Sequence, residues 1–229
     1  MNTIPQQPDG RVRVVRVGIG PLALEGTLAL PEKARGIVLF AHGSGSSRHS
    51  PRNQHVARML RDAGLGTLLI DLLTTDEEAT DRRTGNLRFD INLLANRLIG
   101  ATVWLGREPT TRALRIGYFG ASTGGGAALV AAARRPEPIG AVVSRSGRPD
   151  LAGPVLKQVK APTLRIVGGN DAQVIHMNRE ALPQLRSKAQ LEIVPGASHL
   201  FEEPGALDVV ARLARDWFLR YLEPAGTSS

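Results

Sequence analysis

Short, continuous runs of apolar residues recur along this chain, and they constrain its fold more than any other feature. The clearest is residues 36–41 (GIVLFA), where apolar and polar residues do not alternate. A strand has this pattern when both of its faces are covered, as in parallel sheets. Further strands are expected at residues 67–72, 114–119, 139–144, 163–167 and 190–194.

Helical patterns lie between these runs. After Ser50-Pro51, which is typical of a helix start, the apolar residues return at helical spacing until Gly64. Further helices are expected at residues 88–105, 123–135, 151–159, 174–182 and 205–221. Strands that alternate with helices predict an α/β domain whose mostly parallel central sheet has helices on both faces.

The chain opens with two strands of a different kind. Residues 11–17 alternate basic and apolar side chains, and the turn residues Gly18, Gly20 and Pro21 follow. Residues 22–30 then form the second strand, so we predict an N-terminal hairpin.

No internal repeat or linker interrupts this pattern, so we predict one domain over residues 1–229. Its core covers about 11–222, with loose tails at 1–10 and 224–229. The least patterned stretch, residues 74–86, is polar and too short for a cap domain. We interpret it as a solvated loop, with a flexible flap beside the site as the alternative.

Composition limits the classes of partner. The absence of cysteine excludes disulfides, thiolate metal sites and a cysteine nucleophile. No apolar run is long enough to cross a bilayer, and the polar N-terminus does not resemble a secretory signal, so we expect a cytoplasmic protein. The net charge is +8, but no basic helix, aromatic stacking motif or zinc-ligand spacing accompanies it. We therefore expect no nucleic-acid partner and interpret the charge as solvated surface; steering of an anionic partner is the alternative.

Gly120-Ala121-Ser122-Thr123-Gly124 fits the pattern G-x-S-x-G and stands between an apolar strand and a helix. This strand–turn–helix setting is what a nucleophile elbow requires, because the turn exposes the serine at the edge of the sheet. The following helix start offers unpaired N–H groups where negative charge develops. The alternative is a glycine-rich turn with an idle N-cap serine.

A serine needs a base, and His199 is the best-placed histidine, since it follows the last strand in a loop before the closing helix. The acid that orients the base is expected to be Asp171, which follows the strand at 163–167, with Asp150 as the second choice. The chain order Ser122, Asp171, His199 matches one hydrolase fold.

The glycine-rich segment 41–47 (AHGSGSS) follows the first buried strand. We expect the Ser44 N–H, together with the Thr123 N–H, to form an oxyanion hole, and His42 to brace the turn. A phosphate-binding loop is the weaker reading, because the G-K-[ST] ending is missing. Arg48 and Arg145 are possible substrate-binding residues; the alternative is that they are solvated or form structural ion pairs.

Together these segments resemble the α/β-hydrolase superfamily over about residues 11–222. A finer likeness is to dienelactone-hydrolase-like proteins, and it rests on the segments 24–28 (LEGTL), 41–48 (AHGSGSSR), 168–171 (GGND) and 195–202 (PGASHLFE). The namesake enzyme uses a cysteine nucleophile, whereas this chain has Ser122, so ring opening of the namesake's lactone is not implied. The resemblance implies a single-domain α/β-hydrolase fold and hydrolysis of carboxylic esters, without a metal or an organic cofactor.

The predicted function is therefore a serine hydrolase that cleaves esters of small soluble molecules through an acyl-enzyme. Ser122 attacks, His199 moves the proton, Asp171 orients the ring, and the N–H groups of Ser44 and Thr123 hold the oxyanion. Thioester hydrolysis, amide hydrolysis or acyl transfer on the same triad is the first alternative. A non-catalytic basic binding protein is the second.

Overall fold

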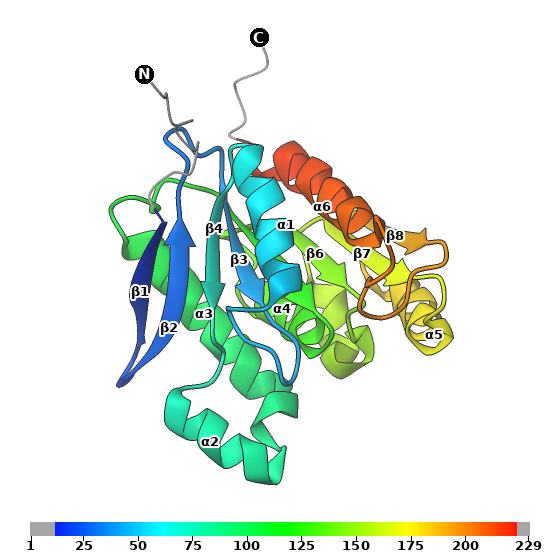
Figure 1. Cartoon of the computed structure of the whole chain (residues 1–229), viewed down its shortest axis with the longest axis horizontal. Coiled ribbons are helices and arrows are strands. Elements are labelled where there is room, and N and C mark those ends of the chain that lie inside the picture. The colour runs from blue at the N-terminus through cyan, green and yellow to red at the C-terminus, as the bar shows by residue number, and fades with distance from the viewer. Residues whose placement is uncertain (1–11, 224–229) are drawn as a thin grey trace, which may run out of the picture.

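A mixed eight-stranded sheet organises the computed structural model, which describes residues 12–223 (Figure 1). The strands are β1 (Val12–Ile19), β2 (Leu22–Ala29), β3 (Ile37–Ala41), β4 (Gly66–Ile70), β5 (Ile116–Ala121), β6 (Ile139–Arg145), β7 (Thr163–Gly168) and β8 (Ala189–Val194). The α-helices are α1 (Pro51–Asp62), α2 (Thr75–Thr84), α3 (Ile91–Arg107), α4 (Thr123–Arg134), α5 (Ala172–Ala181) and α6 (Ala206–Leu222). Three 3-10 helices are η1 (Leu87–Phe89), η2 (Pro149–Gln158) and η3 (Leu182–Gln184). The tails expected at 1–10 and 224–229 lie outside the described residues.

The strand order is β1-β2-β4-β3-β5-β6-β7-β8. The N-terminal hairpin is confirmed: β1 pairs antiparallel with β2, and β2 pairs antiparallel with β4. All pairs from β4 to β8 are parallel. The carboxyl ends of these parallel strands therefore share one edge of the sheet, where loops can bring distant residues together.

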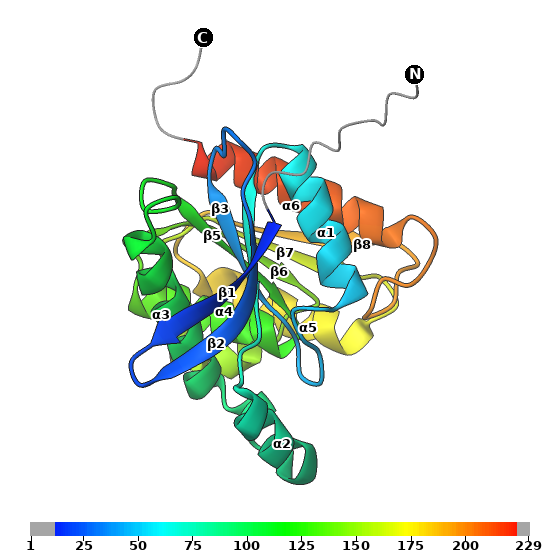
Figure 2. The same cartoon turned by 60° about the vertical axis from the view of Figure 1, so that its left-hand side comes forward.

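Helices cover both faces of the sheet, as predicted. Figure 2 shows α1 and α6 on one side and α3 and α4 on the other. Each side has its own apolar core: Val56, Val210 and Phe218 belong to the α1/α6 core, and Leu98 and Leu129 to the α3/α4 core. Every residue of β3 is buried, which explains its uniformly apolar sequence. No helix within residues 12–223 is long and apolar enough to cross a membrane.

The prediction of a solvated loop at residues 74–86 is wrong, because this segment contains helix α2. Thr74 and Glu77 form a capping box, in which each side chain binds the other's backbone N–H. Acidic residues in the first turn and basic residues in the last turn suit the helix dipole, and Gly85 ends the helix with a positive φ of 68°. Asp81 is the only buried residue of α2, so the helix has no apolar stripe that sequence patterning could detect.

Candidate active site

Ser122 stands at the sharp turn between β5 and α4. Its backbone has φ 50° and ψ −119°, a conformation that non-glycine residues rarely adopt. The turn is held on both sides: the Ser122 N–H donates to the Arg145 carbonyl at 3.0 Å, and the Arg148 N–H donates to the Ser122 carbonyl at 3.2 Å. The backbone strain is thus fixed by the neighbouring strand and loop, as is common at functional sites.

Glycines let the strand and the helix approach each other at this turn. A Cβ on Gly120 would lie 2.5 Å from the Gly124 carbonyl oxygen, and one on Gly124 would lie 2.2 Å from that of Ala41. Ser122 is also the N-cap of α4, so the first N–H groups of the helix, including that of Thr123, have no intrahelical acceptor.

His199 and Asp171 form a hydrogen-bonded pair. His199 Nδ1 lies 2.5 Å from Asp171 Oδ2. Because a carboxylate can only accept, the Nδ1–H donates to Asp171, which leaves His199 Nε2 with a free lone pair. Asp171 is held in turn as the N-cap of α5, where its Oδ1 accepts from the Val174 N–H. The histidine side chain is 38% exposed, so solvent and a small substrate can reach the ring.

Backbone contacts tie the loops of these two residues together. The Asn170 N–H donates to the Ala197 carbonyl at 2.9 Å, and Asn170 Nδ2 donates to the Gly196 carbonyl at 2.8 Å. A Cβ on Gly168 would lie 2.3 Å from the Ser198 carbonyl oxygen, so the loops touch only because glycine is there. The acid and the base therefore belong to one anchored unit.

Ser122, Asp171 and His199 follow β5, β7 and β8 at the same edge of the sheet. Within the described residues, the Ser122 hydroxyl makes no hydrogen bond to the His199 ring. Such contacts are often long without substrate and tighten when it binds.

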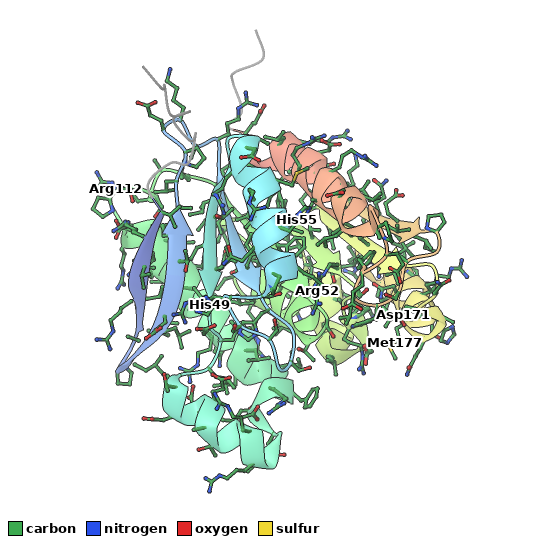
Figure 3. All side chains as sticks on the ribbon, in the orientation of Figure 1. His49, Arg52, His55, Arg112, Asp171 and Met177 are labelled. Carbon is green, nitrogen blue, oxygen red and sulfur yellow. The ribbon has the colours of Figure 1, made fainter. Side chains whose placement is uncertain are left out.

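The remaining histidines have other contacts or positions. His55 on α1 pairs with Asp208 at 2.8 Å, and His176 on α5 lies 3.4 Å from Glu180. His49 is exposed in the loop before α1 (Figure 3). His42 holds the turn after β3: its Nε2 accepts from the Leu72 N–H at 3.1 Å, which leaves the Nδ1–H to donate to the Gly43 carbonyl at 2.9 Å. Burial lowers the pKa of His42, so this ring is neutral and braces the turn.

Ser44 follows this turn, and its backbone N–H donates to Thr123 Oγ1 at 2.9 Å. The two expected oxyanion donors are therefore neighbours, and the Thr123 hydroxyl occupies the Ser44 N–H.

The two arginines singled out in the sequence have different environments. Arg48 is engaged by carboxylates: its Nη1 pairs with Asp71, and its Nη2 lies 2.6 Å from Glu25. These contacts fit the structural alternative for Arg48. Arg145 is 6% exposed, and its Nε and Nη1 atoms are buried with no hydrogen-bond partner among residues 12–223. Burial, and then the like charge of Arg52, lower the pKa of Arg145 to about 10.

A cavity of about 260 Å³ lies beside the expected oxyanion hole. Its lining includes Ser44 and Thr123, and also Glu78 and Arg82 of α2. Residues 12–223 contain no group of three or more His, Asp or Glu side chains that could hold a metal ion.

The model of the Dienelactone hydrolase family matches residues 24–223 of this chain. A solved structure of a dienelactone hydrolase from Anabaena variabilis is 62% identical, with a TM-score of 0.93, and the match covers 95% of this chain and 100% of that one.

The chain belongs to the dienelactone hydrolase family.

Other comparisons place this family member in a wider setting. Est1E from Butyrivibrio proteoclasticus is 15% identical with a TM-score of 0.74, over 90% of this chain and 98% of that one, so it shares the fold. Two curated relatives from Mycobacterium tuberculosis, each named "Putative phosphoribosyl transferase", are 57% identical over 221 residues. These matches cover 96% of this chain and 49% of each relative, so the chain spans about half the length of the curated relatives it matches.

Sequence reasoning missed the residues that α2 contributes to the lining of this cavity. The signal was present as Thr74-x-x-Glu77, a capping box, but no apolar periodicity accompanied it. It also did not predict that the charge of Arg52 acts on Arg145, because nothing in a local pattern shows which distant side chains approach each other.

Proposed function

We propose that this member of the dienelactone hydrolase family is a serine hydrolase that cleaves carboxylic esters of small soluble molecules through an acyl-enzyme. The observation that carries the proposal is the His199–Asp171 hydrogen bond of 2.5 Å at the sheet edge where Ser122 occupies its strained turn. A base oriented by a carboxylate, a strained serine and a helix N-terminus are the elements that acyl transfer needs.

The proposed reaction has two halves. In the first, His199 Nε2 takes the Ser122 proton while Oγ attacks the acyl carbon, and the carbonyl electron pair moves onto oxygen. The N–H groups of Thr123 and Ser44 stabilise this oxyanion. When the intermediate collapses, the bond to the leaving alcohol breaks and His199 returns the proton to the alcohol oxygen. In the second half His199 takes a proton from water, which attacks the acyl carbon. The bond from that carbon to Ser122 Oγ then breaks, and His199 returns the proton to Oγ as the acid leaves.

Two observations support a small substrate. The cavity beside Ser44 and Thr123 is only about 260 Å³, and no cap domain covers the site within the described residues. The same groups would also cleave thioesters or amides, or transfer the acyl group to another alcohol. Rates on matched ester, thioester and amide substrates, with and without a competing alcohol, separate these reactions.

Labelling with a fluorophosphonate probe tests the proposal most directly. We expect the probe to modify the protein and the label to map to Ser122. The variant Ser122→Ala should lower kcat on 4-nitrophenyl acetate by about 10⁴-fold or more, with an unchanged melting temperature. Esterase activity that survives in Ser122→Ala contradicts the assignment of the nucleophile.

A further inference from the structure

The loop between β8 and α6 carries His199 and lies beside the start of α5 (Figure 1). The His199 side chain is 38% exposed, so close packing does not fix the ring. Asp171 holds the ring at Nδ1. The direction in which Nε2 points therefore also depends on how the backbone on either side of His199 is held.

The side chain of Glu203 holds the backbone immediately before His199. Its Oε1 accepts the Ser198 N–H at 3.0 Å, and its Oε2 is buried with no hydrogen-bond partner among residues 12–223. The Ser198 N–H first, and then the Glu203 N–H and the Ser198 side chain, lower the pKa of the Glu203 carboxyl, so the acceptor is a carboxylate at neutral pH. Hydrogen bonds to an ionised acceptor are stronger than those to a neutral one. Glu203 therefore fixes the position of Ser198.

A strained residue anchors the loop on the other side of His199. Phe201 has a positive φ of 56°, which bulky residues rarely adopt, and its side chain is buried in the α1/α6 core. Its N–H donates to the Ser198 carbonyl at 3.3 Å. Such strain persists only where the surrounding contacts impose it. Ser198 is thus held at its N–H by Glu203 and at its carbonyl by Phe201, and His199 lies between these anchors.

We propose that Glu203 is a positioning residue for the proposed base: by fixing Ser198, it directs His199 Nε2 towards Ser122. This inference rests on the proposed esterase function and deepens it. Asp171 orients the ring from its Nδ1 side, and Glu203 orients the backbone from which the ring extends. A misplacement of a reacting group by about 1 Å can lower a rate by about 100-fold, so loss of the Glu203 contact should be visible in catalysis.

The test removes the carboxylate and then restores an acceptor of the same length. Glu203→Leu should lower kcat on 4-nitrophenyl acetate by about 10- to 100-fold and change KM little, because the substrate still binds but the base is misplaced. Glu203→Gln keeps an acceptor oxygen for the Ser198 N–H and should retain kcat to within about twofold of the wild-type value. The rate of fluorophosphonate labelling at Ser122 should fall in parallel with kcat, because His199 also activates the serine for that reaction.

The matched control is Glu202→Leu. It removes the same charge from the neighbouring residue, whose side chain is 63% exposed and pairs with Arg52 at 3.3 Å. The kcat of this variant should equal that of the wild-type protein. An equal fall in both leucine variants would show an effect of charge alone and would overturn the positioning role. A Glu203→Leu variant with a lower melting temperature but full kcat well below that temperature would also overturn it, since the contact would then serve stability alone.

A second pair of variants keeps the test decisive if Glu203→Leu does not fold. Glu203→Asp keeps the charge but has a shorter side chain, so its carboxylate reaches the Ser198 N–H only if the loop shifts. The kcat of Glu203→Gln should therefore exceed that of Glu203→Asp by about fivefold or more, and equal values would contradict the proposal. Failure of the esterase proposal looks different, because the wild-type protein itself would neither hydrolyse the ester nor be labelled at Ser122.

Discussion

The hydrogen atom that serves as the side chain of Gly124 allows α4 to begin directly beside the loop after β3. A Cβ there would meet two carbonyl oxygens, those of Ala41 at 2.2 Å and His42 at 2.5 Å. Both belong to backbone, which cannot move away as a flexible side chain would. The Ser122 turn and the expected oxyanion loop are in contact because this position has no side chain.

Gly124→Ala should therefore destabilise the protein by about 1–3 kcal/mol and lower kcat, since either α4 or the His42 turn must shift. Gly106→Ala is the matched control, because a Cβ there meets nothing within 4 Å. Alanine is the better helix former, so this change in α3 should stabilise by up to about 1 kcal/mol. Urea unfolding of both variants, with esterase kinetics, measures the two effects. Equal stability of the two variants would contradict the steric argument.

The burial of His42 predicts how the stability of the fold depends on pH. Burial lowers its pKa in the folded protein, so the unfolded chain takes up this proton first, near the ordinary value of 6.5. The neutral His42 ring therefore makes its full contribution to the free energy of unfolding above pH 6.5. This contribution decreases as the pH falls towards the lowered pKa of the folded protein. The wild-type protein should lose more stability than His42→Gln between pH 7.5 and about 5.5, as measured by urea midpoints.

The control for this measurement is His176→Gln, which removes an exposed histidine of α5 that is not held in a turn. Its pH dependence should match that of the wild-type protein. A His42→Gln profile that runs parallel to the wild-type profile would show that the folded ring does not resist protonation.

At the scale of elements, the local stability of helix α2 depends more on the contacts at its ends than on apolar packing. Thr74 caps the helix, and Glu77 also pairs with the buried Arg97 of α3. We expect Thr74→Ala to cost about 1 kcal/mol in the local stability of α2, while Thr74→Ser preserves the cap. Amide hydrogen exchange in α2 should then be roughly fivefold faster in the alanine variant, with little change elsewhere. Unchanged protection of α2 would show that contacts other than the cap hold it.

The contrast between α2 and the other elements shows what the sequence can predict. Buried strands such as β3 and helices such as α1 leave apolar runs or stripes, because each presents at least one face to a core. A helix with one buried residue leaves no such pattern. Strand order was also beyond local reasoning, since the pairing of β2 with β4 depends on contacts between segments far apart in the chain.

The same limit applies to the candidate site, where positions at strand ends could be predicted but contacts between side chains could not. Ser122, Asp171 and His199 could be singled out because each follows a recognisable strand and loops at strand ends share one edge of the sheet. The environments of Arg48 and Arg145 could not be predicted. They depend on which carboxylates approach, and Asp71, the partner of Arg48, comes from the segment after β4.

At the scale of the whole molecule, ion pairs within residues 12–223 engage many of the arginines that contribute to the net charge of +8. Many arginines pair with carboxylates on different parts of the surface; examples are Arg13 with Glu108, Arg35 with Glu223, Arg88 with Asp81, and Arg215 with Asp216. Nucleic-acid binding needs cations clustered along a groove or helix. We therefore expect no saturable binding of duplex DNA at physiological salt, as measured by fluorescence anisotropy. Tight, salt-dependent binding would instead support a non-catalytic role.

Hydrogen bonds join the two loops that hold Asp171 and His199. The Ser122 backbone is instead hydrogen-bonded to β6 and to the segment after it. In the proposed mechanism, the group that attacks and the pair that moves the proton are therefore held by separate sets of contacts. Replacing the alcohol by a thiol at position 122 would leave the imidazole and its carboxylate undisturbed. Ser122→Cys would therefore change the proposed reactive atom while the contacts between the two other loops stay in place.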